Sequence, residues 1–595
     1  MMIDSKKLRE MSNAVRATAL RTLGHAQSGH IGIVLSAADI LTMIYAVFFN
    51  PKRDRFVLSA GHGSALLYSV LKLSGYRVGD LDSFRRFGGL PGHPEFGIDG
   101  VSATTGPLGQ GIANAVGMAI AAKHKNTGGR VFCLCSDGDL MEGVAQEAIG
   151  FAGRYNLNNL VVFWDNNGIS IDGVAQTDLN LPMRMRAAGW TVCSVQGDNF
   201  DEIYDAVSMK SNGPLFIQCD TVLGKETSVA GTPAAHGFGI SESEVLSLAE
   251  HFNSFVGNDL WKKLSRQTER GISRKRYSVI PNVSVSNSQH FISTRELSGA
   301  FLSKLMKKNP DLIGGSADLS SSTNVRVDGM CDILPDDFSG NFINFGVREH
   351  AMAAIMNGMA YAGIRSFGST FLVFSDYMRG AMRLSALAGL PVIYVLSHDS
   401  IAVGQDGPTH QPIEQIAGLR LIPNMNVFRP CNMAEVAYSW QTALSETHRP
   451  SCIILSRQKI IQVDNPVFGE IERGGYVIYK NGHHRIKMTL VATGTEVPLA
   501  VSVAKRLGVG VQVVSMPSVA HFMAQDSEYK HRVLRGRVVA IEAGACAGWF
   551  ELADAVIGVD DFGTSGPGDM VYREYGFDTD AIVCAIRGKM KNGKL

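Results

Sequence analysis

Short apolar runs alternate with segments of helical spacing through the first part of the chain. The runs cover residues 131–135, 160–164, 190–195 and 215–219. Apolar runs of this length, separated by helical patterns, indicate parallel strands with helices packed over the sheet. We therefore predict that residues 1–264 form an α/β domain.

The same alternation returns in the middle of the chain. The pattern predicts strands at residues 311–314, 364–369, 392–397 and 452–456. Helical segments lie between them, so the connections again suit parallel strands. A second α/β domain is therefore predicted over residues 291–465.

A third set of apolar runs lies near the C-terminus. Strands are predicted at residues 488–492, 511–514 and 538–541, with a helix that ends near Leu507. This set is shorter than the first two. It predicts a smaller C-terminal α/β domain over residues 466–595.

Residues 265–290 break the pattern. They include the polar, basic run R-Q-T-E-R-G-I-S-R-K-R, which has no apolar periodicity. A basic run can bind nucleic acid, but no aromatic residue is interleaved with it before Tyr277. A linker between the first two domains is the interpretation we favour.

Composition narrows the class of protein. A chain of 595 residues is too long for a single hydrophobic core, so several domains are expected. Its net charge of +1 provides no overall electrostatic attraction for nucleic acid or an anionic membrane. The nine cysteines form no CxxC pair, which favours reduced thiols and a cytoplasmic location. The charged N-terminus does not read as a signal peptide, and no apolar run approaches the roughly 18 residues of a membrane helix.

Two polar positions follow neighbouring predicted strands. Asp137 and Gly138 come directly after the first apolar run, and Asn167 comes after the next. In a parallel sheet both strands end at the same edge, where ligands bind. An Asp and an Asn beside a helix N-terminus suit Mg²⁺ holding a diphosphate. For Asp-Gly alone a solvated turn is the simpler explanation, but the pair at this spacing favours the metal.

Glycine-rich segments suggest a binding cleft. Residues 104–115, T-T-G-P-L-G-Q-G-I-A-N-A, run into a helix whose free N–H groups can meet an anion. His30, His62 and His93 each lie in a turn beside glycine. A single histidine in a turn is most often a surface residue, whereas several in one segment suggest a shared cleft.

The middle domain carries two further polar motifs. Glu349 in G-V-R-E-H fits either a buried acid with a raised pKa or a helix N-terminal charge that interacts with the helix dipole. Residues 398–412 contain two His and two Asp, and their spacing matches no zinc signature. Binding a polyhydroxy compound fits this loop better, because His and Asp pair with hydroxyls.

Three arginines are candidates for holding a phosphate. Arg295, Arg429 and Arg457 all lie in the predicted middle domain. A guanidinium can bind phosphate through two parallel hydrogen bonds. For each of them, an ordinary surface ion pair is the alternative.

Together these motifs resemble the transketolase family of thiamine-diphosphate enzymes. The similarity runs in order from about residue 8 to the C-terminus. It is most specific in F-G-V-R-E-H, S-T-F-L-V-F-S-D-Y-M-R, H-D-S-I-A-V-G-Q-D-G-P-T-H-Q-P-I-E-Q and I-L-S-R-Q. The resemblance implies three consecutive α/β domains. Two are parallel-sheet domains of the thiamine-diphosphate-binding type, one for the diphosphate and metal and one for the pyrimidine, and a smaller C-terminal domain follows.

The resemblance also implies the cofactor and its contacts. Asp137, Asn167 and the carbonyl of Ile169 look like ligands of Mg²⁺ or Ca²⁺, and the carboxyl of Glu349 looks like the partner of the aminopyrimidine ring. The full set of implied cofactor contacts is His62, Gly106, Leu108, Asp137, Gly138, Asn167, His236, Asp318, Glu349, Phe371, Phe374 and Tyr377.

The family's reaction implies roles for substrate-side residues. Glu349, His30, His236 and His410 look like the catalytic, proton-handling groups. The implied substrate-binding set is His30, His93, His236, Arg295, Ser322, His398, Asp406, His410 and Arg457. Of these, Arg295, Ser322, His398 and Arg457 look like the phosphate end.

The implied activity is transfer of a two-carbon ketol unit through a thiamine diphosphate ylid and an enamine. The donor is a ketose phosphate such as xylulose 5-phosphate, and the acceptor is an aldose phosphate such as ribose 5-phosphate. In this family the sites lie at a homodimer interface. The alternatives are a 1-deoxyxylulose-5-phosphate synthase, a dihydroxyacetone synthase and a non-catalytic homologue; the presence of Asp137, Asn167 and Glu349 argues against the last.

Some positions depart from the family pattern. Ser136 replaces the first glycine of G-D-G, a change we expect to be tolerated. Ile31 replaces the proline of S-G-H-P-G, which can loosen the loop that carries His30. The segment before His236 is shortened and altered. We expect these changes to affect the entrance of the implied active site and its fit for longer sugar phosphates.

Overall fold

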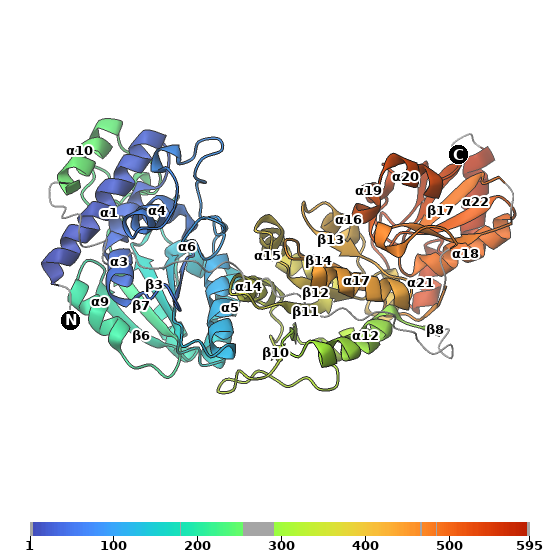
Figure 1. The fold of residues 1–595 in the computed structure, drawn as a ribbon, viewed down its shortest axis with the longest axis horizontal. Helices are drawn as coiled ribbons and strands as arrows, with labels where there is room; N and C mark the ends of the chain where they lie inside the picture. The colour runs from blue at the N-terminus through green and yellow to red at the C-terminus, as the bar shows by residue number, and fades with distance from the viewer. Residues whose placement is uncertain (1–3, 179, 254–290, 464–466, 483–484, 592–595) are drawn as a thin grey trace. The chain divides into compact units, whose positions relative to one another are not determined.

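The computed structural model divides into two compact units, each described by itself here (Figure 1). It describes residues 4–178, 180–253, 291–463, 467–482 and 485–591. Unit 1 contains the described residues up to 253 together with residues 334–339 and 354–364. Unit 2 contains the other described residues from 291 onward.

Unit 1 is built on a five-stranded parallel sheet with the order β1-β2-β3-β7-β6. The four predicted strands are confirmed to within two residues. Strand β1 was not predicted, because only four residues form it. The bounds are β1 Arg55–Leu58, β2 Val131–Ser136, β3 Leu160–Asn166, β6 Thr191–Gln196 and β7 Leu215–Asp220.

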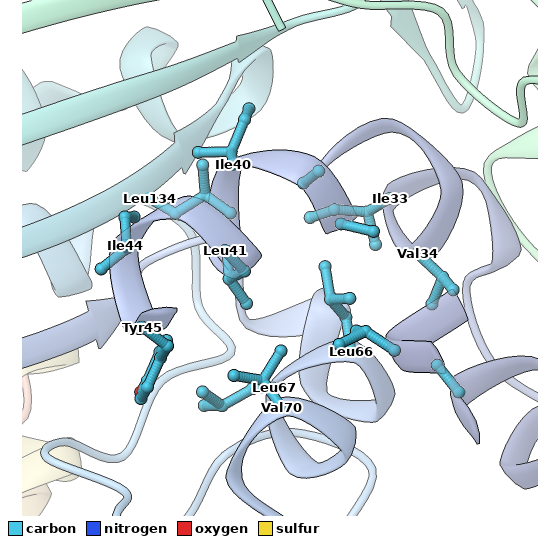
Figure 2. Close-up of a cluster of buried hydrophobic side chains, with 14 of the residues drawn as sticks. Ile33, Val34, Ile40, Leu41, Ile44, Tyr45, Leu66, Leu67, Val70 and Leu134 are labelled. Atoms are coloured by element: carbon cyan, nitrogen blue, oxygen red, sulfur yellow. The ribbon is translucent and has the colours of Figure 1, made fainter. Parts of the chain in front are cut away.

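Helices cover this sheet, and side chains of period two along each strand pack against them. Figure 2 shows one such contact, where Leu134 of β2 lies in a buried cluster with Ile40, Ile44 and Leu66. Because this layer is closely packed, it fixes the strand ends that carry the polar candidates. The helices are α1 Ser5–Ala26, α2 Ile31–Ser36, α3 Ala38–Met43, α4 Ser64–Leu73, α5 Gln110–His124, α6 Asp137–Met141, α7 Gly143–Arg154, α8 Leu181–Ala187, α9 Phe200–Ser208 and α10 Glu242–Asn253.

Unit 2 begins with a six-stranded parallel sheet in the order β10-β9-β11-β12-β14-β13. The four predicted strands are confirmed, two of them shifted by two residues, whereas β10 and β13 have three residues each and were missed. The strands are β9 Ile313–Ser316, β10 Phe342–Asn344, β11 Ser366–Phe371, β12 Ile393–Ser397, β13 Asn426–Phe428 and β14 Ser451–Leu455. The associated helices are α12 Thr294–Lys308, α13 Ser320–Thr323, α14 Glu349–Tyr361, α15 Ser375–Leu387, α16 Gln415–Arg420 and α17 Met433–Ser445.

Unit 2 also contains a short antiparallel pair, β8 Phe291–Ile292 with β15 Ile460–Ile461, and a smaller sheet with the order β16-β18-β17-β19-β20. Strand β16 runs antiparallel to β18, and the other pairs of this sheet are parallel. The predicted strands and the predicted end of a helix at Leu507 are confirmed. The elements are β16 Tyr476–Lys480, β17 Met488–Ala492, α18 Glu496–Leu507, β18 Val511–Ser515, α19 Val519–Met523, α20 Ser527–Val533, β19 Arg537–Ile541, β20 Ala555–Ile557, α21 Gly568–Glu574 and α22 Thr579–Lys591.

The fold class predicted from the sequence, three α/β domains with parallel sheets, is therefore confirmed. The linker predicted at residues 265–290 lies outside the described residues, and the domain boundaries stay a prediction. Among the helices that the structure describes, none has the length and apolar character needed to cross a membrane.

Candidate functional site

The predicted metal residues lie at the carboxyl edge of the sheet in unit 1. Asp137 begins α6 directly after β2, and the residue is only 3% exposed. The amide of Gly168, just beyond β3, donates to its Oδ2 at 3.3 Å, and the Thr177 hydroxyl donates to its Oδ1 at 3.1 Å. The ends of β2 and β3 thus converge as the parallel topology requires.

The chemistry of this edge fits a hard cation. Burial raises the pKa of Asp137, since its hydrogen-bond partners carry no positive charge. The candidate donors are a carboxylate, an amide and a backbone carbonyl, all oxygens of the kind that Mg²⁺ and Ca²⁺ take. The described residues contain no group of three or more His, Cys, Asp or Glu that could hold a metal. Oxygens of a bound diphosphate would complete the shell of a cation held by these donors.

Two buried acids, which the sequence motifs did not indicate, hold the carboxyl edge of this sheet in place. Oδ2 of Asp165 accepts from the Ser36 hydroxyl at 2.8 Å and from Asn167 Nδ2 at 3.2 Å, which fixes the amide orientation of Asn167. Burial raises the pKa of Asp165 to about 6. The clue was the string W-D-N-N, in which an acid lies two positions before the proposed ligand.

Asp139 is the second missed acid, and it ties three segments together. It accepts from the Ser59 hydroxyl at 2.9 Å, the Gly109 amide at 2.8 Å and the Ser136 amide at 3.1 Å. The Ser136 hydroxyl lies 3.3 Å from the same carboxylate. The serine that replaces the family's glycine therefore contributes to the capping of α6.

The glycine-rich loop lies against both the metal edge and the histidines. A Cβ added at Gly61 would lie 2.7 Å from the backbone nitrogen of Gly106, so the two backbones touch. A Cβ added at Gly138 would lie 3.0 Å from Leu108 Cδ1. Gly106, Leu108 and Gly138, the residues implied to contact the cofactor, thus lie close together in unit 1.

Four histidines from separate loops come together in unit 1. The ring centroid of His30 lies 5.2 Å from that of His62, 5.6 Å from that of His236 and 6.2 Å from that of His93. The rings of His62 and His236 are stacked at 5.4 Å. The shared site suggested by several histidines beside glycine is thus present, and His236 joins it from a distant part of the chain.

Burial keeps these imidazoles neutral. It is the largest cause that lowers the pKa of His30 to about 4 and that of His62 well below its ordinary value. Burial also lowers the pKa of His93 and of His236. A neutral imidazole offers one donor and one acceptor, so this cluster can hydrogen-bond sugar hydroxyls and exchange protons with them.

Ile31 makes a backbone hydrogen bond that bears on the loop of His30. Its amide donates to the carbonyl of Gly237 at 2.9 Å, which links the loop of His30 to the segment of His236. Proline has no N–H and could not make this bond. Ile31 therefore gives this loop an additional tie, and the expectation that it loosens the loop is not supported by this contact.

In unit 2, Glu349 combines both properties that its motif suggested. It is the first residue of α14, and it is only 8% exposed. Burial raises the pKa of its carboxyl group, and Thr370 Oγ1 donates to it at 3.5 Å. Burial of a carboxyl with few donors favours its protonated form, which is the property that general acid–base work requires.

The predicted aromatic residues gather at the end of β11. The rings of Phe371 and Phe374 are stacked at 5.8 Å, and Tyr377 lies 6.1 Å from Phe374. His398 stacks on Phe371 at 3.7 Å, and His410 lies 5.3 Å from Phe374. Apolar rings and imidazoles therefore form one surface in unit 2, of which Tyr377 is the exposed member.

Positive charge collects beside this aromatic surface. Burial, then Arg295 and Arg457, lower the pKa of His398 to about 3, so both guanidinium groups lie near its ring. Arg295 Nη1 donates to the carbonyl of Ser322 at 2.5 Å, and its buried Nε has no partner among the described residues. Arg457 Nη1 likewise donates to a carbonyl, that of Val403, at 3.3 Å. Guanidinium groups bound to backbone carbonyls in this way keep further N–H donors that suit a phosphate.

Three other candidates also belong to unit 2. Asp318 follows β9 with a φ of 63° and Asp406 ends the 3₁₀ helix Ile401–Asp406; both are exposed. Arg429 is a correction. It is neither a phosphate clamp nor a surface ion pair, because it is 1% exposed and bound to the buried carboxylates of Asp399 and Glu496.

Family profiles match nearly the whole chain. The profile of the transketolase thiamine diphosphate binding domain matches residues 7–272, that of the pyrimidine binding domain matches 290–462, and that of the transketolase-like C-terminal domain matches 474–578. The chain is 40% identical to a transketolase of Geobacillus stearothermophilus, over 96% of this chain and 97% of the relative.

Solved structures agree with this match. The transketolase of Leishmania mexicana superposes with a TM-score of 0.89 at 34% identity, covering 100% of this chain and 98% of that one. A Pichia stipitis transketolase in complex with sedoheptulose 7-phosphate gives 0.86 at 34% identity, with 98% and 97% covered. The chain therefore belongs to the transketolase family and is a ketol-transferring transferase.

Proposed function

We propose that the enzyme moves a two-carbon ketol unit from a ketose phosphate of the xylulose 5-phosphate type to an aldose phosphate of the ribose 5-phosphate type. The observation that carries this proposal is the pair of guanidinium groups, Arg295 and Arg457, whose positive charges act on the ring of His398 and which hydrogen-bond to backbone carbonyls. A phosphorylated sugar provides both the anion for this pair and hydroxyls for the imidazoles.

In this proposal the diphosphate end of the cofactor is held in unit 1. Asp137, Asn167 and the carbonyl of Ile169 would hold Mg²⁺ or Ca²⁺ together with diphosphate oxygens. Gly106, Leu108 and Gly138 would bring backbone to the cofactor, and His62 and His236 would contact it from the histidine cluster. The convergence of β2 and β3 and the oxygen-rich donor set support this assignment.

Unit 2 would hold the ring end of the cofactor. Thiamine diphosphate supplies, when bound, the carbon nucleophile that a ketol transfer requires. Glu349 would donate a proton from its carboxyl group to a ring nitrogen, which its buried position and raised pKa favour. Phe371, Phe374 and Tyr377 would pack on the ring, and Asp318 would lie on the cofactor side.

The substrate would be held by two sets of side chains. His30, His93, His236 and His410, with Asp406, would bind hydroxyl groups and take or return their protons. Arg295, Ser322, His398 and Arg457 would bind the phosphate. The Pichia stipitis structure, which contains sedoheptulose 7-phosphate, supports a sugar phosphate as the ligand.

We further propose a homodimer with active sites at the subunit interface and a cytoplasmic location. The resemblance to the family suggests the dimer, since each unit carries only part of the proposed cofactor site. Nine free cysteines support a reducing compartment. Nucleic acid and membranes are not proposed as partners.

The test is a mass-spectrometric assay for sedoheptulose 7-phosphate made from xylulose 5-phosphate and ribose 5-phosphate. We expect product only when thiamine diphosphate and a divalent cation are both present. Parallel reactions offer pyruvate with glyceraldehyde 3-phosphate, or formaldehyde as acceptor. Carbon dioxide release from pyruvate, or activity with formaldehyde alone, would overturn the proposed substrates.

Replacing Asp137 with Asn should prevent productive cofactor binding. The amide lacks the negative charge that a divalent cation requires, so we expect the affinity for thiamine diphosphate in Mg²⁺ to fall by more than about 100-fold. Isothermal titration calorimetry measures this directly. The control is Asp172→Asn, which changes an exposed acid between the paired strands β4 Ile169–Ser170 and β5 Gly173–Val174. This variant should bind the cofactor normally. Unchanged affinity of the Asp137 variant would refute the metal assignment.

A further inference from the structure

We propose that Arg85 is a positioning residue that holds His30 as the neutral imidazole with its proton on Nε2. Arg85 belongs to no motif discussed above. The inference deepens the proposed function, because it rests on His30 as a proton-handling group that faces the substrate. Its test nevertheless includes a measurement that does not depend on turnover.

The contact between the two side chains determines the tautomer. Arg85 Nη2 lies 3.3 Å from His30 Nδ1. A guanidinium group has five N–H donors and no acceptor, so Nδ1 must accept in this bond. A neutral imidazole that accepts at Nδ1 carries its proton on Nε2. Protonation of Nδ1 would break the bond and place two cations in contact.

The rest of the guanidinium group is also fixed. Arg85 Nη1 donates to the Ser28 hydroxyl at 2.7 Å, so its two terminal nitrogens span the residues on either side of Gly29. Its Nε is buried and has no partner among the described residues. Two hydrogen bonds to one short segment orient the fork toward His30 rather than toward solvent.

The backbone is arranged to deliver this side chain. Arg85 has a φ of 59°, which a residue with a side chain rarely adopts, and its amide donates to the carbonyl of Leu90 at 2.7 Å. A Cβ added at Gly92 would lie 2.9 Å from Arg85 Nε. The unusual backbone angle and the missing side chain at position 92 both make room for the guanidinium group.

The surroundings of His30 favour the neutral ring. After burial, the groups that lower its pKa are Arg85, His236 and His93, and a hydrogen bond to the backbone of His62 raises it. No carboxylate appears among these influences from the described residues. Arg85 is the one permanent cation of the group, so its removal should make protonation of His30 easier.

The experiment compares Arg85→Met and Arg85→Lys with the wild type in the full-length holoenzyme. Arg86→Met is the matched control, because Arg86 is adjacent and exposed and donates to the backbone of His25 at 3.4 Å. The first measurement is deuterium exchange at the imidazole C2 of His30 as a function of pH, located by tandem mass spectrometry. The second is the pH profile of kcat/KM for the ketose donor.

We expect Arg85→Met to move the exchange midpoint of His30, and the acid limb of the kcat/KM profile, upward by about one pH unit. The direction follows because loss of the neighbouring cation stabilises the protonated ring. Arg85→Lys keeps the charge and should leave the midpoint close to that of the wild type. Arg86→Met should change neither measurement.

Three results would overturn the inference. The first is an exchange midpoint that stays unchanged in Arg85→Met. The second is a higher KM for phosphorylated ketoses only, which would make Arg85 a phosphate-binding residue. The third is a loss of kcat/KM that is equal at every pH and equal in Arg85→Met and Arg85→Lys. A wild type without ketol transfer would instead contradict the proposed substrates, while the exchange data would still decide the role of Arg85.

Discussion

Replacing Glu349 with Gln is expected to reduce ketol transfer by about 10²-fold to 10⁴-fold, the usual contribution of a general acid or base. Glutamine keeps the size of the side chain and can still accept from Thr370, but it has no ionisable proton. The carboxyl group is buried at the start of α14, and burial raises its pKa, which favours the protonated form that the amide cannot replace.

The measurement is kcat for sedoheptulose 7-phosphate formation at saturating cofactor. Glu414→Gln is the control, because Glu414 is an exposed acid in the same unit and should be replaced without loss. A Glu349 variant that kept full turnover would contradict the mechanism. Urea denaturation should show that the fold survives, since the substitution introduces no cavity.

Mixing two inactive variants tests whether the two parts of each proposed active site, that of Asp137 and that of Glu349, come from different subunits. If a dimer builds each site from Asp137 of one subunit and Glu349 of the other, a heterodimer of Asp137→Asn and Glu349→Gln has one intact site and one doubly altered site. Random subunit exchange should then restore about a quarter of the wild-type activity. No recovery in proven heterodimers would place both residues of a site in the same subunit.

The parts of the fold that the sequence predicts are those with a strong local signal. Strands β2, β12 and β17 are largely apolar runs of five or six residues, and all were found. Strands β10 and β13 have three residues each, too few for a period to be recognised. They exist because their neighbours in the sheet offer hydrogen-bonding partners, which no local pattern reveals.

The site follows the same rule. The convergence of Asp137 and the Asn167 segment follows from parallel topology alone, whereas His236 was assigned only through the family resemblance. Arg85 and Asp139 were missed, because nothing in the local strings tells that their side chains point inward. Arg429 was assigned a wrong role. An arginine suits phosphate, and the sequence does not reveal that buried carboxylates surround this one.

Arg429 is the centre of a buried ionic network in unit 2. It donates to Asp399 Oδ2 through Nη2 at 2.8 Å and through Nε at 3.1 Å, and it also pairs with Glu496. Arg420 binds Glu542 through two bonds of 2.8 Å. Burial alone would raise the pKa of Glu542, but Arg420 and then Arg429 lower it to about 2.

This network joins the middle sheet to the C-terminal sheet. Asp399 follows the strand β12 and is adjacent to His398, whereas Glu496 begins α18 and Glu542 follows β19. The Gln458 amide, beside Arg457, also donates to Asp399 Oδ1 at 3.2 Å. The ionic network therefore supports the backbone on which the proposed phosphate-binding side chains are mounted.

Arg429→Met should cost about 3–5 kcal/mol of unfolding free energy at pH 7, because it leaves Asp399 and Glu496 buried without their cation. Urea denaturation measures the loss. The control is Arg506→Met, which removes an exposed pair with Asp580 and should change stability by less than about 1 kcal/mol. A variant as stable as the wild type would mean that the carboxylates find other partners.

The pH dependence separates this explanation from simple loss of packing. In the wild type, Glu542 has a folded pKa of about 2 against an ordinary value of 4.5, so its stabilising contribution is complete above pH 4.5 and is lost as the pH falls toward 2. In Arg429→Met, burial should raise the pKa of the unpaired carboxyl groups, so the folded state binds more protons than the unfolded state. Its stability deficit should therefore be smaller at pH 5 than at pH 7, whereas a packing defect would cost the same at both.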